Sequence, residues 1–129
     1  MKVFLGGTGN DSTWRERLIP LLKIDYYNPV VPDWTPECQA EECRQRELCD
    51  YRLYVITPLM TGVYSIAEAV DDSNKWPTST IFCFLTEDEV GVFDAGQIRS
   101  LNAVGALIRR NGGRYFCCLE HCAQYLNGE

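Results

Sequence analysis

The sequence predicts an α/β fold of the flavodoxin-like or Rossmann-like kind, a three-layer sandwich around a five-stranded parallel sheet. Strand-like and helix-like segments alternate along the 129 residues, and residues 80–85 are continuously apolar, as in strands buried on both faces. Right-handed crossovers then favour a doubly wound strand order. The chain shows no repeat, low-complexity tract or linker, so we expect a single domain over residues 1–129.

The first three elements are a strand, a helix and a second strand. Residues 2–5 are apolar and end at Gly6-Gly7, which is typical of a buried strand followed by a turn. A serine or threonine caps a helix over residues 12–22, whose apolar side chains recur with the helical period. Residues 26–31 form a strand that Asn28-Pro29 interrupts, and proline favours a place at the edge of a sheet.

A charged helix and a third strand follow. Pro36 suits the first position of a helix that runs to about Cys49. The spacings of Glu41 with Arg44, and of Glu42 with Arg46, predict ion pairs on the solvent face of this helix. Residues 51–57 form the third strand.

Five elements complete the pattern: a helix over 65–72, a strand over 80–85, a helix over 95–109, a strand over 114–118 and a helix over 120–126. Gly112 and Gly113 end the helix over 95–109, as glycines commonly do.

Composition and charge exclude several classes of function. The net charge of −6 argues against binding to nucleic acid, which depends on clustered Lys and Arg, while a small metabolite needs only a few local donors. No run of 18 apolar residues predicts a membrane span. The chain enters its first strand directly and shows no signal-peptide core, so we expect a cytoplasmic protein.

The seven cysteines do not indicate a disulfide framework, because their number is odd and no secretory signal precedes them. Cys118-x-x-His121-Cys122 invites a zinc interpretation, but the paired C-x₂-C spacing of structural zinc sites is absent. We therefore expect no metal and no cofactor, and a surface role for His121. A redox or metal protein built on the cysteines remains the weakest alternative.

The most informative segment is Tyr64-Ser65-Ile66-Ala67-Glu68, which follows the third strand and opens a helix. In such folds ligands bind beyond the carboxyl ends of the strands, against a helix N-terminus. We expect Glu68 in the first turn, where the helix dipole favours its ionised form. Ser65-x-x-Glu68 also matches a capping box, as does Thr13-x-x-Glu16, for which a cap is the whole interpretation.

The loops after the other strands add candidate ligand-binding residues. The segment Gly6-Gly7-x-Gly9 lacks the G-x-G-x-x-G spacing of dinucleotide-binding proteins and favours either a tight turn or a ligand close to the backbone. Trp34 is suited to stacking on a heterocycle and Asp33 to hydrogen bonding with it, although tryptophan also serves as a core residue. The binding candidates are Gly6, Gly7, Asn28, Asp33, Trp34, Tyr64 and Ser65.

Together these segments resemble the short branch of the nucleoside 2-deoxyribosyltransferase-like family. The likeness lies in KVFLGGT at 2–8, STWRERLIPLL at 12–22, YYNPVVPDW at 26–34, the segment 49–70 and the IFCFL strand that follows it. It covers about the first two-thirds of the chain. The resemblance implies a flavodoxin-like fold and cleavage or transfer of the N-glycosidic bond of a nucleoside or nucleotide.

The resemblance also implies roles for individual residues. Glu68 would be the nucleophile that forms a glycosyl-enzyme ester, and Asp50 would recognise the base and transfer a proton, as a two-group mechanism requires. Gly62 and Phe4 depart from an aspartate and a tyrosine of the larger members, and we hypothesise that Tyr64 supplies the missing hydroxyl. Relatives assemble, so a homo-oligomer is expected. Because of the two departures, a nucleotide or nucleoside binding module without catalysis remains the alternative.

Overall fold

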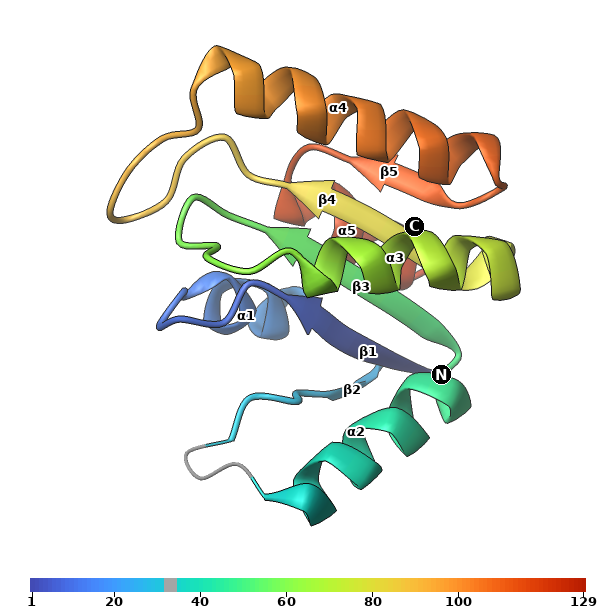
Figure 1. Cartoon of the computed structure of the whole chain (residues 1–129). Helices are drawn as coiled ribbons and strands as arrows, with labels where there is room; N and C mark the ends of the chain where they lie inside the picture. The colour runs from blue at the N-terminus through green and yellow to red at the C-terminus, as the bar shows by residue number, and fades with distance from the viewer. Residues whose placement is uncertain (32–34) are drawn as a thin grey trace.

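A computed structural model describes residues 1–31 and 35–129 (Figure 1). Within these residues, five strands form one sheet in which every pairing is parallel, and their order is β2-β1-β3-β4-β5. This is the flavodoxin-like order, and it confirms the predicted fold class. The strands are β1 (Lys2–Gly7), β2 (Asp25–Tyr27), β3 (Tyr51–Ile56), β4 (Thr80–Phe84) and β5 (Arg114–Phe116).

Helices cover both faces of the sheet and make the outer layers of the sandwich (Figure 1). One face packs against α1 (Trp14–Leu18) and α5 (Leu119–Leu126), and the other against α3 (Tyr64–Lys75) and α4 (Ala95–Arg110). The helix α2 (Pro36–Leu48) lies beyond the β2 edge, and Cys49 at its end packs with the α3 side of the core. No helix of the described residues is long and apolar enough to cross a membrane.

Proline and glycine shift three of the predicted boundaries. The first α-helix stops at Leu18 and passes into a 3₁₀ turn, η1 (Ile19–Leu21), because Pro20 has no N–H to donate and clashes with a continuing helix. The strand β2 ends at Tyr27, one residue before Asn28-Pro29. The strand β1 runs through Gly6-Gly7, since these glycines pair in register with β3. A second 3₁₀ turn, η2 (Pro77–Ser79), precedes β4.

The two predicted capping boxes are wrong. The helix α3 begins at Tyr64 with Val63 as its N-cap, and no side chain caps it, so Ser65 lies inside the helix and Glu68 in its second turn. Thr13 precedes α1 without a capping hydrogen bond, because its backbone N–H and hydroxyl donate to Glu89 instead. The capping box that does form joins Asp94 and Gln97 at the start of α4.

Candidate functional site

A pocket of about 210 Å³ lies beyond the carboxyl ends of β1 and β3, as the fold class predicts. Residues 7–10 form one wall, and Met60, Thr61, Gly62, Tyr64 and Ser65 form much of the other. Among the described residues, its lining carries hydroxyl and amide groups but no Lys, Arg, Asp or Glu side chain. The pocket is therefore suited to an uncharged, hydrogen-bonding group such as a sugar.

Hydrogen bonds between loops keep this pocket open. The Nδ2 group of Asn10 donates to the carbonyl of Leu59 at 3.1 Å and to the hydroxyl of Thr61 at 3.0 Å. The backbone N–H of Leu59 in turn donates to Oδ2 of Asp88 at 2.8 Å. Asn10 has a positive φ of 50°, a conformation that asparagine tolerates better than most residues. The pocket walls are thus held by side chains from three separate loops.

The two glycines of β1 are required by packing. Gly7 has a φ of 114°, and a Cβ there would lie 2.1 Å from the carbonyl oxygen of Val55 on β3. A Cβ on Gly6 would meet the ring of Tyr54 at 2.6 Å. Gly7 also lines the pocket, and its carbonyl lies 3.5 Å from the hydroxyl of Ser65. Gly6 is not among the lining residues, so packing accounts for the glycine at this position, and its role in binding stays a prediction.

A second pocket of about 240 Å³ adjoins the first through Gly9, which lines both. Asn28 and Arg15 contribute to its wall. The guanidinium of Arg15 is buried and donates to the backbone carbonyls of Leu5 and Thr8 at 3.0 and 2.7 Å. Burial lowers the pKa of Arg15 to about 10, while the nearby charge of Glu42 opposes the shift. A buried cation therefore borders this pocket.

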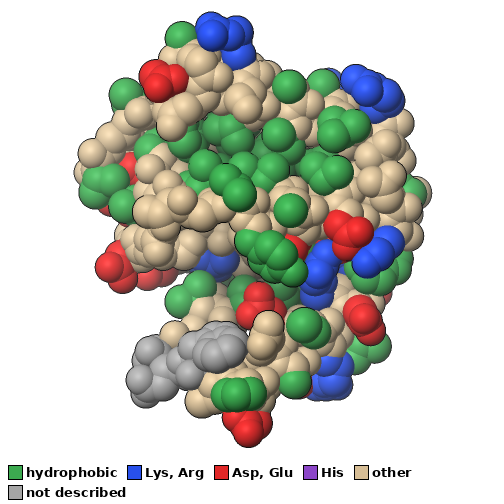
Figure 2. Space-filling view, viewed as in Figure 1, with side chains coloured by type: hydrophobic (Ala, Val, Ile, Leu, Met, Phe, Trp, Pro, Cys, Tyr) green, Lys and Arg blue, Asp and Glu red, His purple; other side chains and the backbone are tan. Residues whose placement is uncertain are grey.

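Charged side chains meet where α2 faces α3. Figure 2 shows the surface hollowed between the part of the molecule formed by α2 and the body that carries α3, with acidic and basic groups along the hollow. There Nη1 of Arg46, on α2, forms an ion pair with Oε2 of Glu68, on α3, at 3.3 Å. Only 18% of the Arg46 side chain and 15% of the Glu68 side chain are exposed. The pair is thus largely shielded from water.

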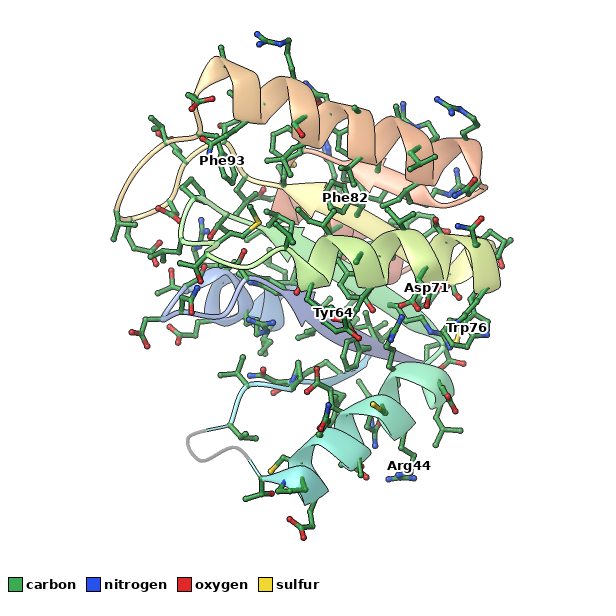
Figure 3. The ribbon with its side chains drawn as sticks, viewed as in Figure 1. Arg44, Tyr64, Asp71, Trp76, Phe82 and Phe93 are labelled. Atoms are coloured by element: carbon green, nitrogen blue, oxygen red, sulfur yellow. The ribbon has the colours of Figure 1, made fainter. Side chains whose placement is uncertain are left out.

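The guanidinium of Arg46 also binds a buried carboxylate, that of Asp72. Its Nε lies 3.0 Å from Oδ1 of Asp72 and its Nη2 lies 2.5 Å from the same oxygen. Asp72 has no exposed surface, and its Oδ2 accepts a hydrogen bond of 2.5 Å from the hydroxyl of Tyr54 on β3. Arg46 also reaches the half-exposed Asp71 at 3.2 Å. Figure 3 shows Asp71 directed toward α2.

One of the two predicted ion pairs on α2 forms and the other does not. Glu41 and Arg44 pair at 2.7 Å on the exposed face, as expected, and Figure 3 shows Arg44 pointing away from α3. The pairing of Glu42 with Arg46 on a solvent face is wrong, because Arg46 turns to the acids of α3. The one-turn spacing of 42 and 46 instead places both residues on the face that borders the hollow.

Two carboxyl groups in this hollow have raised pKa values. Burial is the main cause of the rise at Glu68; Arg46 opposes it, and the charges of Glu42, Asp72 and Asp71 add to it. Burial also raises the pKa of Glu42, against the opposing charges of Arg15 and Arg46. The expected stabilisation of ionised Glu68 by the helix dipole is thus outweighed by burial. Glu42 is close enough for its charge to disfavour ionisation of Glu68.

The remaining predicted residues lie in several places. Tyr64 and Ser65 line the first pocket and Asn28 the second, whereas Asp33 and Trp34 lie outside the described residues. Asp50 directly precedes β3, at the amino-terminal end of that strand, where its Oδ2 accepts from the backbone N–H of Lys2 at 2.8 Å. The structure therefore does not bring Asp50 together with Glu68.

The structure also shows the surroundings of Phe4 and Gly62, the two positions that differ from the larger members of the resembled family. The ring of Phe4 is buried and stacks on Tyr27, so position 4 serves the core. Tyr64 is 74% exposed at the pocket rim, and the hydroxyl that belongs to the Glu68 cluster comes from Tyr54. Gly62 lies in the pocket wall with nothing near its missing side chain.

Sequence reasoning missed Glu42, Arg46, Asp72 and Tyr54 as parts of this cluster. The available signal was the one-turn spacing of 42 with 46 and of 68 with 72, which places two charged pairs on facing helical stripes. Among the described residues, no group of three or more His, Cys, Asp or Glu side chains is arranged to hold a metal ion. None of the seven cysteines, all of which lie among the described residues, forms a disulfide.

Comparison of the chain with protein-family models, with curated proteins and with solved structures returned no match. The resemblance to nucleoside 2-deoxyribosyltransferase-like proteins thus remains an expectation from sequence motifs. The function is therefore inferred from the charged groups around Glu42 and Glu68.

Proposed function

We propose that this protein cleaves or transfers the N-glycosidic bond of a nucleoside or nucleotide. The observation that carries the proposal is the shielded carboxyl group of Glu68 on α3, which pairs with Arg46 of α2, together with Glu42 of α2, whose charge raises the pKa of Glu68. Glycosidic chemistry of the retaining kind needs one carboxylate as nucleophile and one carboxylic acid as proton donor. The pKa values of both groups are raised, and the charge of Glu42 contributes to the rise at Glu68, which favours a state with one proton on the pair.

Glu68 is assigned as the nucleophile, because its ion pair with Arg46 favours the ionised form against the burial that raises its pKa. A lone pair on the Glu68 carboxylate forms a bond to the anomeric carbon, and the bond from that carbon to the base nitrogen breaks. The departing base takes the proton of Glu42, which becomes a carboxylate. Water, or an acceptor base, then attacks the anomeric carbon while Glu42 accepts its proton and the bond to Glu68 breaks. Glu42 thus replaces Asp50 as the acid and base.

The pocket beyond β1 and β3, whose lining includes Ser65 one helical turn before Glu68, supports a sugar substrate. Its backbone and hydroxyl groups, including those at Gly7, Thr8 and Ser65, are suited to hydrogen bonding with ribose or deoxyribose oxygens. Tyr64 at the rim offers an exposed ring on which a base can stack. The expected homo-oligomer and cytoplasmic location stay predictions.

A panel of ribo- and deoxyribonucleosides and their 5′-monophosphates tests the proposal. The folded protein is incubated with each compound, with and without an acceptor base, and free or exchanged base is followed by chromatography. We expect release without acceptor if the enzyme is a hydrolase, and exchange if it is a transferase. Absence of both for every compound would reject catalysis, and calorimetric binding of a panel member would then favour the binding module.

Matched variants test the assigned roles. Glu68→Gln is expected to abolish turnover, and Glu42→Gln to lower kcat by about 100-fold or more, in line with the loss of a general acid and base. Glu41→Gln removes a neighbouring carboxylate whose hydrogen bonds within the described residues go to Arg44 and Gln45 on its own helix, so it should leave kcat unchanged. Full activity of Glu42→Gln would show that another group protonates the base.

A further inference from the structure

Glu68 is engaged through one of its two carboxylate oxygens. Nη1 of Arg46 pairs with Oε2, and no hydrogen bond from any described residue reaches Oε1. The same arginine uses Nε and Nη2 on Asp72 and Nη2 on Asp71. A guanidinium is a planar fork, so fixing Nε and Nη2 on one carboxylate also fixes the direction of Nη1.

The fork is fixed by groups that cannot easily move. Asp72 is fully buried and receives the Tyr54 hydroxyl from the centre of the sheet. The end of α2 is also anchored, because Arg52 of β3 donates to the carbonyls of Arg46 and Glu47, at 2.6 and 2.7 Å. The side chain and the backbone of Arg46 are thus both tied to β3. Exposed ion pairs form without buried partners of this kind, so these contacts distinguish Arg46 from a simple surface arginine.

We propose that Arg46 is a positioning residue, aimed by Asp72 and Tyr54, which holds Oε2 of Glu68 and leaves Oε1 as the atom that attacks the anomeric carbon. This inference rests on the proposed function for the attack itself, while the aiming of Arg46 at Glu68 is independent of it. The charged and titratable groups around Glu68 are Arg46 and Glu42 on α2, Asp71 and Asp72 on α3, and Tyr54 on β3.

The proposal has a chemical consequence for both half-reactions. Before attack, Arg46 favours the ionised carboxylate against the burial and the acids that disfavour it. After attack, Glu68 is a neutral ester bonded through Oε1, and Oε2 becomes its carbonyl oxygen. Arg46 then polarises that oxygen, which assists departure of the carboxylate when water or an acceptor base attacks. One cation therefore serves both steps without moving.

The test combines kinetics with a measurement that needs no turnover. Arg46→Met should lower kcat by about 100-fold with little change in KM, as expected for a misplaced reacting group. The acidic limb of its pH–rate profile should move to higher pH. In ¹³C NMR titrations of glutamate carboxyl groups, with Glu68 assigned through Glu68→Gln, the pKa of Glu68 should rise in Arg46→Met. Arg44→Met, on the exposed face of α2, should change none of these.

Two further variants keep the test decisive if Arg46→Met does not fold. Tyr54→Phe keeps every charge and removes only the hydroxyl that donates to Asp72. A lower kcat in this variant therefore supports the proposal that Asp72 and Tyr54 orient Arg46. Arg46→Lys keeps the positive charge but lacks the planar guanidinium. Its Glu68 pKa should therefore lie close to that of the wild type, while its kcat stays well below the wild-type value. An unchanged Glu68 titration in the folded variants overturns the proposal. A shifted titration in a protein without turnover would instead reject the proposed function and retain the role of Arg46 in holding Glu68.

Discussion

Replacing Gly7 by alanine should destabilise the fold strongly. The backbone at Gly7 has a φ of 114°, and the new Cβ would lie 2.1 Å from the Val55 carbonyl oxygen and 2.6 Å from its nitrogen. A strained backbone conformation costs about 1–3 kcal/mol, and overpacking adds about 1–3 kcal/mol. The sum, roughly 2–6 kcal/mol, is a large part of the stability of a typical domain, about 5–15 kcal/mol.

Urea denaturation followed by circular dichroism measures this effect. With an m-value of about 2 kcal/mol/M, the loss moves the midpoint by about 1–3 M. Gly9→Ala is the matched control, because nothing lies within 4 Å of a Cβ at Gly9 and its φ is not in the left-handed region. We expect the control to change stability by about 1 kcal/mol or less. Equal midpoints for the two variants would refute the argument that β1 packing requires Gly7.

Two further predictions concern the helix ends and the pH dependence of stability. Asp94→Ala should lower the free energy of unfolding, measured by urea denaturation, by about 0.5–2 kcal/mol, as loss of an N-cap does. Ser65→Ala should lower it by about 0.5 kcal/mol or less, since Ser65 caps nothing. A larger loss for Ser65→Ala than for Asp94→Ala would instead support a capping box at Ser65. Burial raises the pKa of Glu68 above its ordinary 4.5, so the folded state binds this proton more tightly than the unfolded state and loses stability as pH rises from about 4.5 through the folded pKa. In Glu68→Gln the free energy of unfolding should therefore decline less between about pH 4 and pH 7, and identical pH profiles in urea titrations would contradict the assigned burial.

Much of the fold could be predicted because its signals are local. The apolar run at β4 and the glycines after Arg110 act through nearest neighbours and the solvent, so the elements and their parallel order follow from pattern. The exact helix starts could not be predicted in this way. Ser65 and Asp94 belong to equally plausible capping patterns, and only the path of the chain into each helix decides which one forms.

The candidate site was predictable only in part. The carboxyl edge of β1 and β3 follows from topology, and with it the pocket lined by Gly7, Tyr64 and Ser65. The partner of Glu68 was not predictable, since Glu42 and Arg46 have an ordinary surface spacing on a charged helix. The resemblance implied a role for Asp50, yet Asp50 lies at the amino-terminal end of β3 and accepts a hydrogen bond from Lys2 there, away from the carboxyl ends that border the pocket.

The amino-acid sequence by itself therefore determined the sheet, its helical layers and the edge at which a ligand would bind, because short-range patterns encode secondary structure and parallel topology places the strand ends. Tertiary structure alone decided which charges meet. The side chains of Arg46, Glu68, Asp72 and Tyr54 come from three elements, α2, α3 and β3. Their contacts depend on how those elements pack, and burial in that packing raises the pKa of Glu68 where its place in the helix had predicted an ionised carboxylate.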